Sequence, residues 1–397
     1  MNQPAQRLVA RALRAGGPEV IEVGVEELPP LKQGEALVRV EATGLNDVGA
    51  GPSAAAPRAP LMLASGWGPL APTRRCASLG PRLHVSPEAG RRAEFRSPSR
   101  RFCPRCKAAR PPRHAETLIR SGNYTVRMPF PYPLGGEGSG VVVATGPGAP
   151  IAVGTRVCWA AVIGSCATFV TAPASMFVPI PEGLSFEDGA CLAVASLTAG
   201  GLARVWPLQG RQAVVWGAAG AVGRMLVAIL ADRQVEVIGV ATGKRVDAVR
   251  AAGAIYVIDR AVEDVGEAVR GYTGGRGVAA VFDPIGASTC ETSLQMLAPR
   301  GCLVSYGELS GPPPAVKLRQ LFAGSLFVTK YNGMQWAAFH EFPALISNGL
   351  ALATKRRAII SDIAGRFALN QVVDAYRELE SGSHGKVLVF PGQHPAA

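Results

Sequence analysis

The feature that most constrains the fold is one stretch, from Gln212 to Lys244. It begins with a short apolar run, Ala213 to Trp216, followed by a turn of glycine, alanine and valine, Gly217 to Gly223. Apolar residues at helical spacing come next, and a β-branched run, Val235 to Val240, follows them. Strand, turn, helix and strand in this order predict a βαβ unit. The turn of such a unit lies at a helix N-terminus, where backbone amides bind pyrophosphate.

The glycines of the turn have distinct predicted roles. Gly220 would let the backbone approach phosphate oxygens, and Gly223 would let the helix pack closely on the strand. Ala218 stands where the G-x-G-x-x-G pattern has its first glycine, so the motif alone is weak, and its support comes from the flanking strand and helix. The residues predicted to contact the dinucleotide here are Gly217, Ala219, Gly220, Ala221, Val222 and Gly223.

The end of the second strand indicates which dinucleotide binds. An NAD site needs an acid there to accept hydrogen bonds from the ribose 2′-hydroxyl, and none follows Ala241. Lys244 and Arg245 stand there instead and would pair with a 2′-phosphate, which favours NADPH. The alternative is that these cations, and Arg260 after the next strand, are only solvated. The residues predicted to bind the cofactor at this corner are Thr242, Gly243, Lys244, Arg245 and Arg260.

Composition bounds the size and the location of the protein. The chain has 397 residues, 48% of them hydrophobic, which is enough for a sizeable core and for two domains. No run of 18 apolar residues occurs, and the first residues lack the apolar core of a secretory signal, so we expect a cytoplasmic protein without a membrane span. The eight cysteines do not suggest a disulfide framework.

The net charge of +12 is concentrated in one segment. Thirteen basic and two acidic residues lie between 51 and 113, which accounts for +11 of the total. Residues 49–113 also carry eleven of the 32 prolines and show no sustained helical or strand period. We interpret this segment as a disordered insertion or a gene-model artefact. A basic RNA-binding arm is less favoured because it has few aromatic residues for stacking on bases, so nucleic acid is not an expected partner.

The remaining patterns form two groups. Strands of a small antiparallel β domain are predicted at 19–25, 35–41, 140–144, 153–157 and 167–171, with an exposed-edge strand at 385–390. A doubly wound parallel sheet is predicted from further strands at 255–258, 278–282, 302–306 and 326–330, with helices from Ser185, at 198–205, 246–252 and 288–297.

Several short motifs occur in the order of a known family. They are Thr43-Gly44-Leu45-Asn46, Arg120-Ser121-Gly122-Asn123-Tyr124, Leu134-Gly135-Gly136-Glu137-Gly138-Ser139-Gly140, Ala218-Ala219-Gly220-Ala221-Val222-Gly223, Leu297-Ala298-Pro299-Arg300-Gly301, Ser305-Tyr306-Gly307 and Gly385-Lys386-Val387. Together they resemble the zinc-independent quinone oxidoreductase branch, the zeta-crystallin-like enzymes, of the medium-chain dehydrogenase/reductase superfamily. The resemblance covers nearly the whole chain except 49–113.

This resemblance implies an α/β fold with a GroES-like β domain and a Rossmann doubly wound parallel-sheet domain. The expected bounds are 1–180 for the GroES-like domain, 181–325 for the Rossmann NADPH-binding domain, and 326–397 for the end of the sheet and the return to the first domain. It also implies a homo-oligomer, commonly a dimer joined edge to edge through the nucleotide-domain sheets. The implied activity is NADPH-dependent hydride transfer to quinones or related conjugated carbonyls.

No zinc site is expected. Zinc-containing relatives have Gly-His-Glu where this chain has Gly135-Gly136-Glu137, and a ligand cysteine where it has Thr43 to Asn46. A catalytic zinc normally takes three protein ligands. Cys103 and Cys106 have irregularly spaced companions and precede the position of the family's cysteine-rich lobe.

Five residues are predicted to act at the reacting end of the site. Asn46 would orient the substrate or the nicotinamide carboxamide, or else be a turn residue that caps a helix. Tyr124 would stack on the substrate, or else fill the core. Thr198 would abut the nicotinamide, or else bond its own helix backbone. Tyr306 and Gly307 would approach the nicotinamide through their backbone. Two alternative functions remain: reduction of 2-enoyl thioesters in the same fold, and a non-catalytic NADPH- or RNA-binding role.

Overall fold

The computed structural model describes residues 4–46, 115–122, 128–382 and 384–392. All of these residues belong to one compact unit, Met1–Pro52 with Arg110–Ala397. The predictions made for residues 49–113, for Cys103 and Cys106, and for Tyr124 lie outside the described residues.

A six-stranded sheet contains the predicted βαβ unit. All of its strands pair in parallel, in the order β11-β10-β9-β12-β13-β14. The chain order reverses beside β9, which is the switch point of a doubly wound sheet. The predicted Rossmann fold is therefore confirmed. Its strands are β9 (Gln212–Val215), β10 (Glu236–Ala241), β11 (Tyr256–Asp259), β12 (Val278–Asp283), β13 (Leu297–Ser305) and β14 (Phe327–Lys330).

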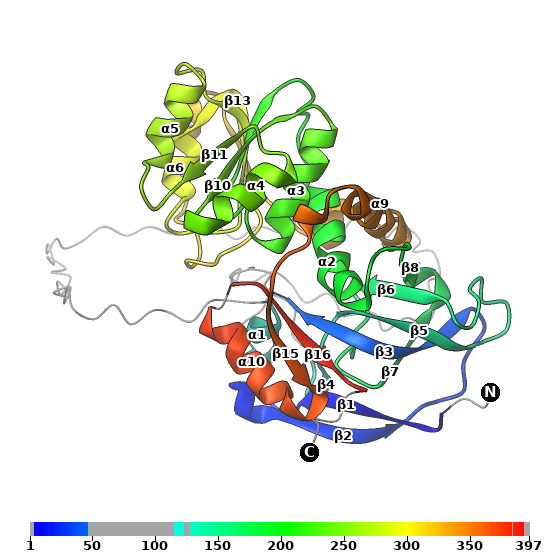
Figure 1. The fold of residues 1–397 in the computed structure, drawn as a ribbon. Coiled ribbons are helices and arrows are strands. Elements are labelled where there is room, and N and C mark those ends of the chain that lie inside the picture. The colour runs from blue at the N-terminus through cyan, green and yellow to red at the C-terminus, as the bar shows by residue number, and fades with distance from the viewer. Residues whose placement is uncertain (1–3, 47–114, 123–127, 383, 393–397) are drawn as a thin grey trace, which may run out of the picture. The chain divides into compact units, whose positions relative to one another are not determined.

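Helices cover both faces of this sheet because successive strand residues point to opposite sides. Ala213 and Val215 of β9 belong to one apolar cluster and Val214 to another. Figure 1 shows α5 and α6 on the opposite side of the sheet from α3 and α4. The helices of the first cluster are α2 (Phe186–Leu202), α3 (Ala221–Asp232), α4 (Val246–Ala252) and α9 (Phe342–Lys355). Those of the second are α5 (Val265–Tyr272) and α6 (Cys290–Gln295).

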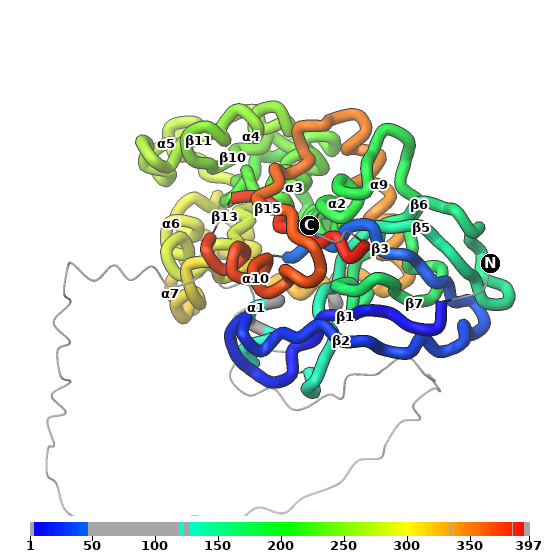
Figure 2. The backbone as a smooth tube through the Cα atoms, turned by 60° about the horizontal axis from the view of Figure 1, so that its bottom comes forward, coloured from blue at the N-terminus to red at the C-terminus, as the bar shows by residue number. Residues whose placement is uncertain are grey.

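The predicted β domain is also confirmed, and it joins the two ends of the chain. In a seven-stranded sheet, the C-terminal strand pairs antiparallel with an N-terminal strand, which in turn pairs with the strand that contains Glu137. The members are β3 (Glu35–Leu45), β5 (Glu137–Thr145), β6 (Arg156–Ala160), β7 (Phe169–Pro173), β8 (Val178–Pro179), β15 (Ile363–Ala368) and β16 (Lys386–Phe390). A smaller sheet contains β1 (Gln6–Ala12), β2 (Ile21–Glu27) and β4 (Tyr132–Pro133), and Figure 2 shows β1 and β2 side by side.

The prediction of an exposed edge strand at the C-terminal end is wrong. β16 lies between β15 and β3, and its first four residues are buried. The parallel partner, β15, comes from the segment 363–368, where no strand was predicted from the sequence. β6 also starts later than predicted, because Gly154 has a φ of 88° and turns the chain just before it.

One continuous helix, α2, replaces the two predicted helical segments that began at Ser185 and Thr198. Ser185 and Asp188 form a reciprocal capping box at its start. The remaining helices are α1 (Ala115–Arg120), α7 (Leu318–Phe322), α8 (Gly333–Trp336) and α10 (Val372–Ser381). No helix among the described residues is both long and apolar enough to cross a bilayer. The cytoplasmic location stays a prediction.

Candidate active site

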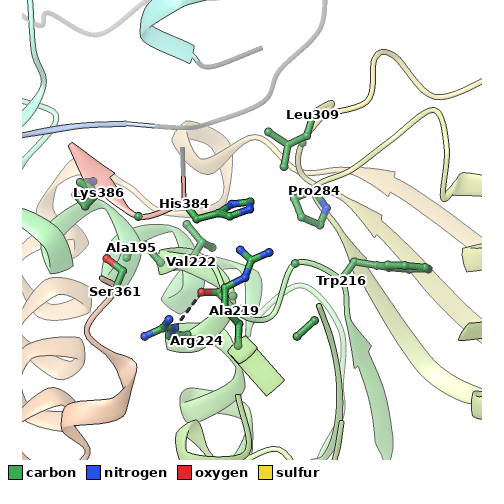
Figure 3. A pocket seen from close by; sticks show the side chains of 18 of the residues that line it. Ala195, Trp216, Ala219, Val222, Arg224, Pro284, Leu309, Ser361, His384 and Lys386 are labelled. Carbon is green, nitrogen blue, oxygen red and sulfur yellow. Dashed lines mark hydrogen bonds between the residues drawn. The ribbon is translucent and has the colours of Figure 1, made fainter. Parts of the chain in front are cut away.

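A pocket of about 310 Å³ lies at the carboxyl ends of β9, β10, β12 and β13. Residues of the seven-stranded sheet complete its lining, from the end of β3 and the start of β16. In Figure 3, Trp216 and Pro284 lie on one side of the pocket and Ser361 and Lys386 on the other, with His384 between them. Ligands of doubly wound sheets bind outside the carboxyl ends of the strands at the switch point, so this pocket is the candidate site.

The glycine turn between β9 and α3 forms one wall. A Cβ at Gly223 would lie 2.3 Å from the Gly217 carbonyl oxygen and 2.8 Å from the Ala218 Cα, so only glycine lets α3 approach the turn this closely. A Cβ at Gly220 would meet only the Gly217 oxygen, at 3.4 Å. All six turn residues predicted to contact the dinucleotide line the pocket. The open space at Gly220 lies at the N-terminus of α3, where an anion is favoured.

A buried arginine that was not predicted from the sequence holds this turn. Arg224 is 4% exposed, and its Nε donates to the Ala219 carbonyl oxygen at 2.9 Å, the bond drawn dashed in Figure 3. Its Nη1 donates to the Ile360 carbonyl oxygen at 3.0 Å, and Nη2 pairs with Asp362 Oδ2 at 2.8 Å. Arg224 therefore ties the glycine turn to the segment that leads into β15.

A cluster of cations lines the pocket beyond the end of β10. Thr242, Arg245 and Arg260 are part of the lining, and Arg260 Nε donates to Thr242 Oγ1 at 3.2 Å. Burial lowers the pKa of Arg245, and the neighbouring guanidiniums of Arg260 and Arg224 lower it further. Within the described residues neither Arg245 nor Arg260 has an ion-pair partner. Unpaired cations at this corner suit a bound anion.

Two residues predicted for this corner lie outside the pocket lining. Lys244 is exposed, and Gly243 donates its backbone N–H to Asp259 Oδ2 at 3.0 Å. The other carboxylate oxygen of Asp259 accepts the Ala261 N–H at 3.0 Å. The Asp259 carboxylate therefore fixes the loops that follow β10 and β11 by accepting hydrogen bonds from their backbone N–H groups.

Four residues that were predicted to contact the substrate or the nicotinamide also line the pocket. They are Asn46, Thr198, Tyr306 and Gly307. A Cβ at Gly307 would lie 2.3 Å from the Pro284 carbonyl oxygen, so glycine is required for the backbone to pass there. The roles given to these residues stay predictions.

A buried polar network stands beside Asn46. Lys386 Nζ donates to Glu137 Oε2 at 2.5 Å and to Asn46 Oδ1 at 2.7 Å, and Glu137 Oε1 accepts the Val194 N–H at 2.6 Å. The side chain of Glu137 is fully buried, and Lys386 and Asn46 are 6% and 8% exposed. Burial raises the pKa of Glu137, and the charge of Lys386 opposes this rise most strongly. Gly44 makes room for the pair, since a Cβ there would lie 2.7 Å from Lys386 Cε and 2.9 Å from Glu137 Oε2.

No metal cluster is found in the described part of the chain, where no three His, Cys, Asp or Glu side chains come together. The expected absence of zinc stays a prediction, because residues 47–114 lie outside the described residues.

Two family models match the chain. One, described as alcohol dehydrogenase GroES-like domain, matches residues 112–214, and the other, described as zinc-binding dehydrogenase, matches residues 221–349. The boundary between the two matches falls at the glycine turn, where the two sheets contribute to one pocket.

Similar proteins point to one branch of the medium-chain dehydrogenase/reductase superfamily. The chain is 34% identical to a quinone oxidoreductase of Pseudomonas aeruginosa over 283 residues, which are 70% of this chain and 87% of that protein. The solved structure of a mycobacterial protein complexed with NADPH is 28% identical with a TM-score of 0.70, and the match covers 97% of this chain and 100% of that one. The Escherichia coli quinone oxidoreductase complexed with NADPH is 26% identical, with the same TM-score and the same coverage. The chain therefore belongs to the quinone oxidoreductase branch of the medium-chain dehydrogenase/reductase superfamily and is an oxidoreductase of that type.

Proposed function

We propose that this protein binds NADPH in the pocket and transfers its hydride to quinones or related conjugated carbonyl compounds, without a catalytic zinc. The observation that carries the proposal is the pair Arg245 and Arg260, which line the pocket at the end of β10, where an NAD site would place an acid. The NADPH complexes of similar solved structures support the choice of cofactor.

The donor set at this corner fits a 2′-phosphate. Two guanidiniums and the Thr242 hydroxyl can all donate to phosphate oxygens, and charge-assisted bonds of this kind are about twice as strong as neutral ones. Burial lowers the pKa of Arg245 most, and repulsion from Arg260 and Arg224 lowers it further; a bound dianion would offset that repulsion. The pyrophosphate would lie at the glycine turn, against the first amides of α3.

The reacting end of the pocket would position the substrate and exclude water. Bound NADPH supplies the hydride. Leu45, Val194 and Trp216 give the pocket apolar walls, and Thr198 and Asn46 offer polar atoms among them. Exclusion of water strengthens each polar contact to the acceptor oxygen. A quinone can take its protons from water after reduction, so a dedicated acid is not required.

Cofactor oxidation tests this proposal directly. The purified protein should oxidise NADPH in the presence of simple ortho- and para-quinones, and NADH should be a much poorer donor. An equal rate with NADH would contradict the cofactor assignment. Turnover of 2-enoyl thioesters in preference to quinones would move the substrate assignment to the alternative acceptor.

The zinc-free chemistry can be tested separately. We expect extensive dialysis against a chelator to leave quinone reduction unchanged, and elemental analysis of the active protein to find no stoichiometric zinc. Loss of activity on dialysis, with recovery on addition of zinc, would contradict this part of the proposal.

We also propose that the protein is a homodimer joined through the edge of the six-stranded sheet. β14 is the terminal strand, and its Phe327 is 50% exposed. Leu318 and Phe322 of the neighbouring α7 are 84% and 86% exposed. Apolar side chains beside an unpaired strand edge favour association. Light scattering should show a dimer for the wild type and a monomer for Leu318→Lys/Phe322→Lys, and a monomeric wild type would contradict the proposal.

A further inference from the structure

We propose that Lys386 contacts the acceptor and stabilises the negative charge that develops on its oxygen, with Glu137 as a fixed counter-charge that keeps the ammonium in place. This inference rests on the proposed function, because it assigns a role to a residue of the same pocket. Lys386 lines that pocket and comes from the start of β16, close to the end of the chain.

The hydrogen bonds of Lys386 leave one donor for a ligand. An ammonium has three N–H groups. Two of them go to Glu137 Oε2 and Asn46 Oδ1, at 2.5 Å and 2.7 Å, and these are the bonds that Nζ makes within the described residues. The side chain is held at the lining by both partners, so the third N–H needs little reorganisation to meet an acceptor oxygen.

The reaction creates a charge that such a donor can stabilise. In a conjugated carbonyl, the hydride forms a C–H bond with both of its electrons, the C=C π bond shifts, and an electron pair ends on the carbonyl oxygen. In a quinone, the hydride that ends as an O–H bond on one carbonyl oxygen leaves an electron pair on the other oxygen, and the product is a phenolate. The oxygen later takes a proton from water, and Lys386 keeps its three protons throughout. A fixed donor directed at an oxyanion is among the largest contributions to such reactions.

Glu137 and Gly44 make this arrangement possible. A lone buried ammonium would be costly, and the fully buried carboxylate compensates its charge. Glu137 is itself fixed by the Val194 N–H at 2.6 Å. Any side chain at Gly44 would collide with the Ala190 carbonyl oxygen, 2.3 Å from the added Cβ, as well as with the pair. Glu137 is therefore a positioning residue that acts through Lys386.

The test replaces the charged pair by uncharged pairs that can still fold. Glu137→Gln/Lys386→Gln keeps hydrogen-bonding groups, and Glu137→Met/Lys386→Met replaces the pair by apolar side chains, which proteins often tolerate at buried ion pairs. Lys355→Gln is the control, since it removes a lysine charge from the exposed end of α9. For each folded protein we would measure kcat with a quinone, the Kd of NADPH, and the Kd of a substituted phenol in the presence of NADP⁺, above and below the pKa of the phenol.

We expect both double variants to lose about 100-fold in kcat. The Kd of NADPH should stay within about threefold, because Thr242, Arg245 and Arg260, which we propose hold the 2′-phosphate, are unchanged. The phenolate should bind at least about tenfold more weakly, and the neutral phenol as tightly as before. Wild-type values of kcat and phenolate affinity in either folded double variant would overturn the role of Lys386.

The two proposals fail in different ways. If the wild type does not reduce quinones but its phenolate affinity falls in the double variants, the acceptor class is wrong and the oxyanion role of Lys386 stands. If the wild type reduces quinones and the double variants behave like it, the function stands and the role of Lys386 is wrong.

Discussion

The two ends of the pocket hold positive charge in opposite ways. At the corner beyond β10 where we propose that the 2′-phosphate binds, which we call the phosphate corner, burial and the guanidiniums of Arg260 and Arg224 lower the pKa of Arg245. Neither Arg245 nor Arg260 has an ion-pair partner among the described residues. At the reacting end, Lys386 is buried and bonded to the carboxylate of Glu137. Water solvates a cation that reaches the surface when no ligand is bound, whereas a buried cation needs a permanent counter-charge. The first arrangement suits an anion that arrives fully charged, and the second suits a charge that appears only during the reaction.

The comparison predicts that the two ends respond differently to loss of a charge. Substitution at the buried end should change the stability of the fold, and substitution at the phosphate corner should change affinity alone. Four variants test this difference, in order of decreasing effect.

Lys386→Met alone should have the largest effect. It leaves the carboxylate of Glu137 buried without its cation, which we expect to lower the free energy of unfolding by about 3 to 5 kcal/mol. Denaturant unfolding measures this value. Glu137→Met/Lys386→Met, which removes both charges, is the matched variant and should recover most of the loss. Equal stability of the single and double variants would show that the pair is not coupled.

Gly44→Ala should come next. The new methyl group would displace the Ala190 backbone and the Lys386 side chain, and overpacking of this kind costs about 1 to 3 kcal/mol. Gly24→Ala is the matched control, because Gly24 also lies in a strand and a Cβ there meets nothing within 4 Å. If thermal unfolding gives the same change for both variants, close packing at Gly44 is not the cause.

The same contrast explains what could be predicted from the sequence. The phosphate corner is local: the glycine turn and the residues after β10 follow from one βαβ pattern, and the structure places Thr242, Arg245 and Arg260 on one pocket. The buried network joins residues that are 340 positions apart, and no periodicity relates Asn46 to Lys386.

The role of Arg224 was not predicted from the sequence, and the position of β16 was predicted wrongly, for a similar physical reason. An arginine within a helix pattern usually reaches solvent. Arg224 is buried because the tertiary fold brings the segment 360–362 close enough to accept its hydrogen bonds. The C-terminal strand had the pattern of an edge because its parallel partner, β15, carries no clear strand period. In both cases the deciding partner lies far away in the chain.

Arg245→Ala tests the phosphate corner. It removes a charge-assisted contact worth roughly 1.5 to 3 kcal/mol before solvent screening, so we expect NADPH to bind on the order of tenfold more weakly. Affinity for NADH should hardly change, because NADH lacks the 2′-phosphate. Fluorescence titration with both cofactors measures the difference, and unfolding of the variant should match that of the wild type. Equal losses for both cofactors would mean that the loop had been disturbed.

Lys244→Ala should have the smallest effect, although Lys244 precedes Arg245 directly and carries the same charge. Its side chain is exposed and lies outside the pocket lining, whereas Arg245 is half-buried within it. The attraction between an exposed charge and a bound phosphate is screened by salt, so NADPH should bind no more than about threefold more weakly to Lys244→Ala, and the loss should vanish at high ionic strength. The comparison with Arg245→Ala in the same titration separates direct contact from long-range attraction. A tenfold loss for Lys244→Ala that persists in salt would show that the loop closes on the phosphate and brings both cations into contact with it.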